Sequence, residues 1–247
     1  YFSEFGFKIM FYGIIVGLGI IGGIWIAAHL ADKEGLGSDI IYDLALFEVP
    51  LCILGARIYY VIFQWDFYKA NPAEIINLRG GGLAIYGAVI MAFIVLAVFV
   101  KVKKVSPWRI ADCAINGLIL GQAIGRWGNF FNREAFGAET DVFCRMGLTA
   151  ADGTTIYVHP TFLYESLWNL IGLFILILFT RRGRRRFDGQ CVLFYFFWYG
   201  LGRSWIEGLR TDSLYLGNTG IRVSQLLSLI LVLVSGTVLF LDRKSVV

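Results

Sequence analysis

Residues 11–30 read FYGIIVGLGIIGGIWIAAHL and contain no Asp, Glu, Lys or Arg. A helix needs about 20 apolar residues to cross the roughly 30 Å hydrocarbon layer of a bilayer. The stretch meets that length, and it is too long for the apolar part of a signal peptide. We therefore expect it to be the first of several retained transmembrane helices.

Six further apolar runs follow it. They cover residues 44–63, 83–100, 110–124, 162–180, 191–209 and 223–241. Continuous apolar runs are typical of helical membrane proteins, because the strands of a β-barrel alternate over about ten residues. The chain is 57% hydrophobic and 16% charged, whereas soluble domains carry about 25% charged residues. The prediction is an all-α, polytopic membrane protein with about seven transmembrane helices in a single domain, residues 1–247.

The basic residues predict its orientation, because Lys and Arg in short loops mark the cytoplasmic side. One set of alternate loops contains twelve of them, mostly in two clusters at residues 101–109 and 181–186, and the opposite set contains eight. We expect the N-terminus outside, the C-terminus in the cytoplasm, and the long polar connection 125–158 on the outer face. An anionic inner leaflet accounts for the net charge of +4, so no nucleic-acid partner is expected.

Two classes of function find little support. The four Cys and two His residues are scattered, so neither a disulfide framework nor a zinc site is expected, and we predict no metal. A transporter built on inverted repeats would show interrupted spans in matching positions of two halves, and none is present.

Residues 125–137, GRWGNFFNREAFG, directly follow the fourth predicted span. Glycine permits close backbone approach, Arg presents a planar fork to phosphate oxygens, and Asn adds uncharged donors and acceptors. The segment therefore suits a phosphate-bearing group near the membrane surface. Alternatively, Arg126 and Arg133 snorkel to lipid headgroups while Glu134 pairs locally. Composition leaves both interpretations open.

A second polar group lies near the end of the sixth predicted span. Tyr199, Arg203, Glu207 and Arg210 follow one another at spacings of four and three, which places them on one helical face. Charges at membrane depth normally face a bundle interior or a wet cavity and mark a functional path. A purely structural Arg203–Glu207 ion pair is the alternative.

Arg57 and Tyr12 lie toward the outer ends of two predicted spans and could line an outward-facing cavity. The alternative for each is a snorkelling or aromatic-belt residue, which we prefer for Tyr12. His159 and Pro160 open the fifth predicted span. Glu165 follows just inside it, where a structural cap and ion-pair partner is expected rather than a catalytic base.

The motif Gly125-Arg126-x-Gly128-Asn129-Phe130-x-Asn132-x-Glu134-x-x-Gly137 resembles the signature of the bacterial phosphatidylglycerol:prolipoprotein diacylglyceryl transferases. Other pieces agree in the same order over nearly the whole chain. They are Tyr12-Gly13, Gly55-Ala56-Arg57, the glycines before Leu83, His159-Pro160 through Tyr164-Glu165, and Tyr199 with Arg203, Glu207 and Arg210.

The resemblance implies transfer of diacylglyceryl from phosphatidylglycerol to the lipobox cysteine of a prolipoprotein signal peptide, with release of glycerol phosphate. It implies the bacterial cytoplasmic membrane, a site open to the outer face, and no cofactor. By matching positions, Arg126 and Arg203 hold the lipid phosphate. Asn129, Glu134 and Glu207 would arrange the polar site, Gly137 would give backbone access, and Tyr12, Arg57, Tyr199 and Arg210 would contact substrate.

One position departs from the family. Many members carry His in a Gly-Gly-x-x-x-His-Gly stretch, and this chain has Tyr86 there. A phenol with a pKa near 10 is a poor base at neutral pH, whereas a thiol with a pKa of about 8.5 already supplies some thiolate. We therefore expect Arg126 and Arg203 to stabilise the departing phosphate, and Tyr86 to orient the headgroup or relay the thiol proton.

Two alternative functions remain open. In a lipid or solute transporter the same Arg face would bind an anionic substrate. Another phospholipid transferase would normally need an Asp-rich metal motif, and none is found in the sequence.

Overall fold

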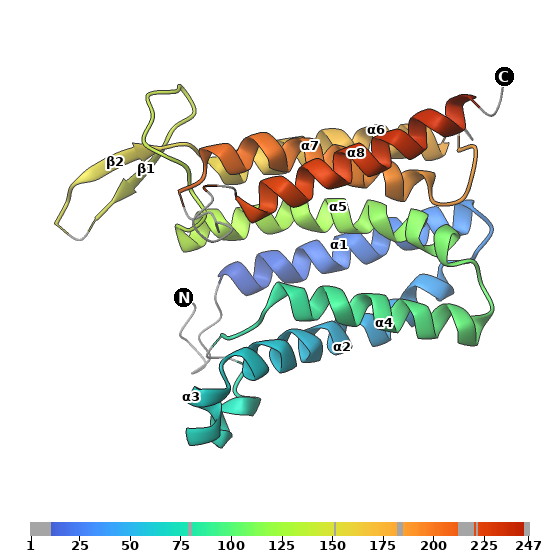
Figure 1. The fold of residues 1–247 in the computed structure, drawn as a ribbon, viewed down its shortest axis with the longest axis horizontal. Coiled ribbons are helices and arrows are strands. Elements are labelled where there is room, and N and C mark those ends of the chain that lie inside the picture. The colour runs from blue at the N-terminus through green and yellow to red at the C-terminus, as the bar shows by residue number, and fades with distance from the viewer. Residues whose placement is uncertain are drawn as a thin grey trace. The chain divides into compact units, whose positions relative to one another are not determined.

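The computed structural model describes residues 11–78, 81–150, 152–181, 185–211, 220 and 222–244. Its long helices are α1 (Phe11–Lys33), α2 (Asp39–Phe63), α4 (Ile85–Lys103), α5 (Pro107–Asn132), α6 (Thr161–Arg181), α7 (Gln190–Leu209) and α8 (Val223–Lys244) (Figure 1). The short elements are α3 (Trp65–Ala70), the 3-10 helix η1 (Pro72–Ile76) and the antiparallel hairpin of β1 (Met146–Thr149) and β2 (Thr155–Val158). Lys8, Arg79 and residues 182–184, which contributed to the predicted orientation, lie outside the described residues.

Within the part of the chain that the structure describes, five helices are long and apolar enough to cross a membrane: α1, α2, α4, α6 and α8. They confirm a polytopic helical membrane protein. The other two predicted spans, residues 110–124 and 191–209, lie within α5 and α7. These two helices are not among the five candidate spans, and both carry polar residues along their length, such as Gln122 on α5 and Arg203 on α7.

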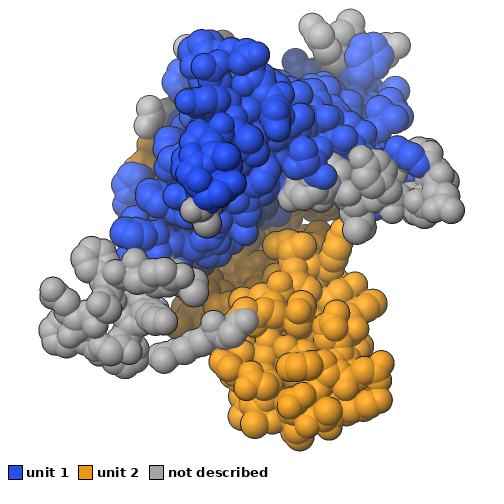
Figure 2. All heavy atoms as spheres, turned by 90° about the vertical axis from the view of Figure 1, so that its left-hand side faces the viewer, with its two compact units in different colours: residues 1–27, 111–247 blue, residues 28–110 orange. Residues whose placement is uncertain are grey.

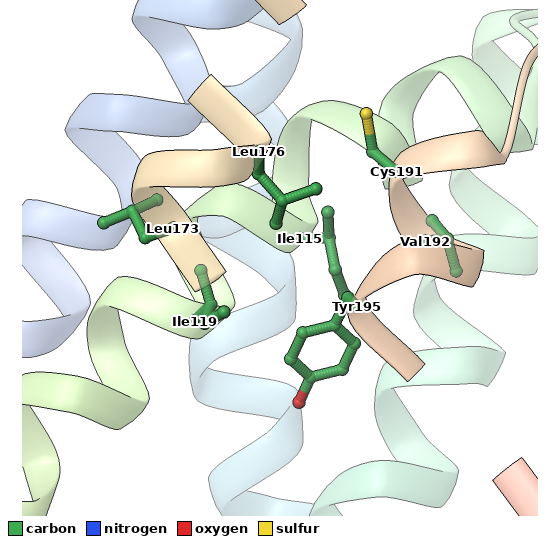
Figure 3. Packing of buried hydrophobic residues seen from close by; sticks show 7 residues of the cluster. All are labelled: Ile115, Ile119, Leu173, Leu176, Cys191, Val192 and Tyr195. Atoms are coloured by element: carbon green, nitrogen blue, oxygen red, sulfur yellow. The ribbon is translucent and has the colours of Figure 1, made fainter. Parts of the chain in front are cut away.

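The chain forms two compact units, one of residues 1–27 and 111–247 and the other of residues 28–110 (Figure 2). In the first unit, apolar side chains of α5, α6 and α7 converge on one buried cluster (Figure 3). Its members are Ile115, Ile119, Leu173, Leu176, Cys191, Val192 and Tyr195. This cluster lets α5, α6 and α7 present polar residues to one another elsewhere along their length.

Two tryptophans fix the register of α6 against α7. The Nε1 of Trp168 donates to the carbonyl oxygen of Trp198, and the Nε1 of Trp198 donates to the carbonyl oxygen of Trp168, both at 2.9 Å. Their rings stack with centroids 4.4 Å apart. Each ring covers a glycine of the facing helix, Gly202 under Trp168 and Gly172 under Trp198, where a Cβ would overlap the indole. The two helices therefore meet in a single register.

The start of α7 is capped from α5. Asp112 is 2% exposed, and its two carboxylate oxygens accept from the backbone N–H groups of Gly189 at 2.7 Å and Val192 at 3.1 Å. Arg185 approaches the same carboxylate at 3.5 Å. An anion at a helix N-terminus satisfies amides that have no partner within the helix, so Asp112 anchors α7 at the end opposite to Glu207.

The predicted outer loop 125–158 is a loop only in part. Helix α5 continues through Asn132, so the first eight residues of the motif are helical, and the hairpin occupies the far end of the segment. The expectation of a loop from Gly125 was wrong because the glycines at 125 and 128 suggested irregular backbone. Gly128 instead makes room for the ring of Tyr12, which a Cβ would approach to 2.7 Å.

In the second unit, α2 and α4 cross at Gly55, where a Cβ would lie 2.6 Å from the Cβ of Met91 and 2.8 Å from the carbonyl oxygen of Gly87. The backbones therefore approach closely at this crossing, as helices in lipid do where small residues meet. Lys103 and Asp43 form an ion pair between the same two helices at 2.5 Å.

Candidate functional site

Four charged side chains of the first unit form one continuous chain of ion pairs. Nη2 of Arg126 on α5 contacts Oε2 of Glu165 on α6 at 2.5 Å. The other oxygen of Glu165 accepts from Nη1 of Arg203 on α7 at 2.7 Å, and Nη2 of Arg203 contacts Oε2 of Glu207 at 2.6 Å. We call these four residues the Arg–Glu chain. The structure thus unites the two predicted phosphate-binding arginines through a shared carboxylate.

The Arg–Glu chain is largely buried. The side chains of Glu165 and Glu207 are 6% and 3% exposed, and those of Arg203 and Arg126 are 15% and 23% exposed. Pairing is what allows four charges at such a depth, because an unpaired buried ion is strongly destabilising. The exposure rises toward Arg126, so this arginine is the member most accessible to a ligand.

Neighbouring contacts hold α5 against α6 at this point. The hydroxyl of Ser166 donates to the carbonyl oxygen of Ala123 at 2.9 Å and accepts from Nε1 of Trp127 at 3.2 Å. Ser166 follows Glu165, and Trp127 follows Arg126. The ion pair between α5 and α6 therefore rests on a hydrogen-bonded contact of the residues beside it.

The ion pairs leave donor capacity on both arginines. A guanidinium has five N–H groups. Contacts to Glu165 and Glu207 occupy one nitrogen of Arg126 and two of Arg203. The formal charges of the four residues cancel, so an incoming anion does not meet a net negative site. An arginine with free N–H groups in a water-poor site is well suited to phosphate oxygens.

Asn129 and Glu134 form a separate polar cluster at the end of α5. The side-chain amides of Asn129 and Asn132 donate to Oε1 of Glu134 at 2.9 and 3.3 Å. Arg133 and Ala135, on either side of Glu134, have φ of +54° and +56°, so the chain turns sharply here. The three motif residues thus interact with one another and fix the turn that leaves α5.

Gly137 serves close packing of backbone segments. Its N–H donates to the carbonyl oxygen of His159 at 3.0 Å, and it pairs with Arg210 in a β-bridge. A Cβ at this position would lie 2.7 Å from the Cβ of His159 and 2.9 Å from the carbonyl oxygen of Leu209. The resemblance to the family also implies that the lipid reaches the backbone at Gly137, and this remains a prediction.

Arg210 is not on the helical face predicted for it. Helix α7 ends at Leu209, and Arg210 has φ −75° and ψ 147°, an extended conformation. Spacing alone could not show this, because the β-bridge to Gly137 that draws the chain away joins residues far apart in sequence. Tyr199, Arg203 and Glu207 are all helical, as predicted.

Arg57 and Tyr86 belong to the second unit. Arg57 is 5% exposed, and all five of its N–H groups donate to backbone carbonyl oxygens at 2.5–3.0 Å. The acceptors are Glu74, Ile75, Asn77, Gly81 and Gly82. A phosphate contact would have to replace one of these bonds. Tyr86 is 57% exposed at the start of α4, with its ring 6.3 Å from that of Tyr59.

Arg57 also explains the predicted glycine run. Gly81 and Gly82 have φ of +87° and +75°, which side chains other than hydrogen rarely permit. A Cβ on Gly82 would lie 2.9 Å from the ring of Tyr60 and would also meet the guanidinium of Arg57. The segment wraps around the guanidinium, which needs glycine at the point of closest approach.

Three contributors were missed or undervalued in the sequence. Glu165 was expected to be an ion-pair partner, and it is, but its central position between both arginines was not foreseen. Asn169 lies one helical turn beyond Glu165 and lines a small cleft with it, which a helical spacing of four could have indicated. Arg222 donates to the carbonyl oxygen of Glu207, a contact between distant segments that no local pattern signals.

Comparisons with known proteins identify the family of this chain. The sequence profile of the family described as prolipoprotein diacylglyceryl transferase matches residues 1–241. The chain belongs to this family. Among curated members, the phosphatidylglycerol–prolipoprotein diacylglyceryl transferase of Bacillus cereus strain G9842 is 45% identical over 245 residues, which cover 96% of this chain and 89% of that protein. The proteins of the same name from Bacillus anthracis strain CDC 684 / NRRL 3495 and Bacillus thuringiensis subsp. konkukian strain 97-27 are 44% and 45% identical, with the same coverage.

Proposed function

We propose that this transferase moves the diacylglyceryl group of phosphatidylglycerol to the thiol of a lipobox cysteine, at the Arg–Glu chain. The observation that carries the proposal is that Glu165 joins Arg126 and Arg203 in one largely buried ion-pair chain. Family membership supplies the reaction, the first step of bacterial lipoprotein maturation. The two arginines supply the cations that would bind a lipid phosphate.

The reaction forms one bond and breaks one. The cysteine sulfur attacks the terminal carbon of the diacylglyceryl group, and the bond from that carbon to the phosphate oxygen breaks. Glycerol phosphate leaves, and it can take up the thiol proton, so no other reactant is needed. Negative charge grows on the leaving oxygen, and positioned donors in a site with little water stabilise such charge strongly. We assign that task to Arg126 and Arg203, with Glu207 holding Arg203 in place.

Tyr86 has the second proposed role in the reaction. We propose that its phenol orients the lipid headgroup or relays the thiol proton. Its exposure at the start of α4 and its alignment with a family position often held by His support this role. Asn129, Glu134 and Gly137 shape the polar region, and Tyr12, Tyr199 and Arg210 contact substrate or its immediate surroundings. We place Arg57 as a support of the segment before Tyr86.

We further propose seven transmembrane helices within one membrane-embedded domain, with the N-terminus outside and the C-terminus in the cytoplasm. The basic clusters and the extents of α5 and α7 support this count. The Arg–Glu chain then opens to the outer face of the bacterial cytoplasmic membrane, where prolipoprotein signal peptides with a lipobox cysteine are presented. The partners are phosphatidylglycerol, such peptides and the surrounding lipid, with no nucleic acid.

The test is a reconstituted reaction. The purified protein is incubated in liposomes with phosphatidylglycerol and a lipobox peptide, while peptide mass and free glycerol phosphate are measured. We expect a diacylglyceryl mass gain matched by one equivalent of glycerol phosphate, and no gain when the peptide cysteine is replaced by serine. A folded protein that binds the lipid but leaves the peptide unchanged would favour the transport alternative.

A further inference from the structure

The beginning of α8 is attached to the last two turns of α7, the helix that carries Arg203 and Glu207, and the two helices lie side by side (Figure 1). Arg222, the residue directly before α8, donates from Nη1 to the backbone carbonyl oxygen of Glu207. Nε2 of Gln225, in the first turn of α8, donates to the carbonyl oxygen of Ser204 at 3.0 Å. We call Arg222 and Gln225 the α8 clamp.

Close packing of the two backbones determines where the clamp acts. One turn before Ser204, a Cβ on Gly200 would lie 2.8 Å from the carbonyl oxygen of Ser228 and 2.8 Å from Cγ2 of Val232. Gly200, Ser204 and Glu207 are spaced by four and three residues, so their contacts with α8 follow one side of α7. The approach at Gly200 therefore sets the register that brings the clamp to the carbonyl groups of Ser204 and Glu207.

Glu207 lies in the part of α7 that most needs such support. The last carbonyl groups of an α-helix lack an N–H partner within the helix, and helix ends open at little cost in free energy. The carbonyl oxygen of Glu207 accepts from the N–H of Arg210 at 3.2 Å and from the guanidinium of Arg222. A cation is favourable at a helix C-terminus because that end of the helix dipole is negative. Arg222 therefore opposes opening of the turn that carries the Glu207 carboxylate.

Opening of this turn would also release Arg203. Oε2 of Glu207 contacts Nη2 of Arg203 at 2.6 Å, and Glu165 holds the other terminal nitrogen at 2.7 Å. If the last turn of α7 opened, the Glu207 carboxylate would move with its backbone, and Arg203 would keep only the contact with Glu165. Donors stabilise a developing negative charge most strongly when they are held in place before the reaction. The orientation of Arg203 therefore depends on the backbone of Glu207.

We infer that the α8 clamp positions Glu207, and through it Arg203, for the transfer reaction. The inference rests on the proposed function and deepens it, because it adds a fourth helix to the three that carry the Arg–Glu chain. Arg222 and Gln225 are positioning residues, and neither needs to touch the lipid or the peptide. Arg222 has the larger effect of the two, because a charged donor forms the stronger hydrogen bond.

The test measures kcat for thioether formation and KM for phosphatidylglycerol, in liposomes with a lipobox peptide as acceptor. For Arg222→Gln we expect kcat to fall about tenfold to a hundredfold, the range for losing a hydrogen bond with a charged donor. KM should change by about threefold or less, because both phosphate-binding arginines remain. Arg222→Lys should recover most of the lost rate, since an ammonium can also donate to the carbonyl oxygen. Gln225→Leu, which removes a neutral donor, should lower kcat by about tenfold or less.

A matched control and a double variant separate positioning from general stabilisation of the fold. Thr237→Val is the control, because its hydroxyl donates to the carbonyl oxygen of Leu233 within α8 at 2.6 Å, and we expect an unchanged kcat. Arg222→Gln is then combined with Glu207→Gln. If the clamp acts through Glu207, the double variant should stay within about threefold of Glu207→Gln alone, as residues that act together do.

Three results would overturn the inference. They are an unchanged kcat in Arg222→Gln, an equal loss in Thr237→Val, and losses that multiply in the double variant. Each of these leaves the proposed function intact, because the unaltered protein still forms the thioether. No thioether formation by the unaltered protein would instead refute the proposed function.

Discussion

Arg57 is buried and Arg203 is largely buried, and their surroundings differ. Arg57 gives all five N–H groups to backbone carbonyl oxygens of one short segment. Arg203 contacts two carboxylates, one from its own helix and one from α6. The first arginine is saturated by neutral groups, so a ligand would have to replace one of these hydrogen bonds. The second is held by anions, and an anionic ligand can compete for its N–H groups.

The difference separates structural from functional arginines by their partners. A guanidinium that donates only to backbone carbonyl oxygens holds those segments of the chain together. Carboxylates balance its charge and share it with a neighbour, as Glu165 does between Arg126 and Arg203.

The largest effect is expected for Arg203→Gln. Losing one charged donor at a developing negative charge lowers rates by about 10²–10³, and here Glu165 and Glu207 also lose their shared partner. We expect thioether formation to fall by about three orders of magnitude. The rate is measured by peptide mass with folded protein verified by size-exclusion chromatography. A variant that retains more than a tenth of the activity would contradict the role of Arg203.

Arg57→Ala should act on stability. It removes five hydrogen bonds from a charged donor, each of which contributes about 1.5–3 kcal/mol when the donor is charged. We expect cleavage between residues 64 and 84 by added protease and an unfolding free energy lower by at least about 3 kcal/mol. Loss of activity should follow loss of folded protein. If Arg57→Lys stays folded and protease-resistant but no longer binds lipid, Arg57 is a substrate contact and the contrast with Arg203 fails.

Gly202→Ala probes the register that brings Glu165 to Arg203. Its Cβ would overlap the ring of Trp168, which also lines the cleft. We expect destabilisation of about 1–3 kcal/mol, typical of overpacking, and reduced transfer by the remaining folded protein. Gly208→Ala in the same helix is the control, because its Cβ would meet only the amide of Gln225 at 3.6 Å. Equal thermal stability of the two variants would remove the tryptophan–glycine contact from the explanation.

Tyr86→Phe should have the smallest effect. We expect a decrease in transfer of about tenfold or less, because glycerol phosphate and solvent can also accept the thiol proton. Tyr59→Phe is the matched control, since its ring packs beside Tyr86 and stacks on Phe63 at 4.5 Å. A thousandfold loss in Tyr86→Phe, with no loss in Tyr59→Phe, would mean that proton transfer contributes more to the rate than phosphate binding by the arginines.

The sequence predicted the helices well because apolar runs and lipid thickness together determine where they lie. The Arg203–Glu207 pair could also be predicted from the sequence, since residues four apart on a helix are neighbours. The position of Glu165 between two arginines could not be predicted from the sequence. It depends on the register of α6 against α7, which Trp168 and Trp198 set across the interface. The saturation of Arg57 depends likewise on a segment that returns to it some twenty residues later.

Whether Arg126 and Arg203 act as one unit on the lipid phosphate is tested most directly by a double-variant cycle. Thioether formation is measured at saturating phosphatidylglycerol for Arg126→Gln, Arg203→Gln and the two combined. Because both arginines share Glu165, we expect each single variant to lose about 10³-fold and the double variant to lose little more, as residues that act together do. Losses that multiply, or a single variant within tenfold of the unaltered protein, would contradict a shared phosphate site.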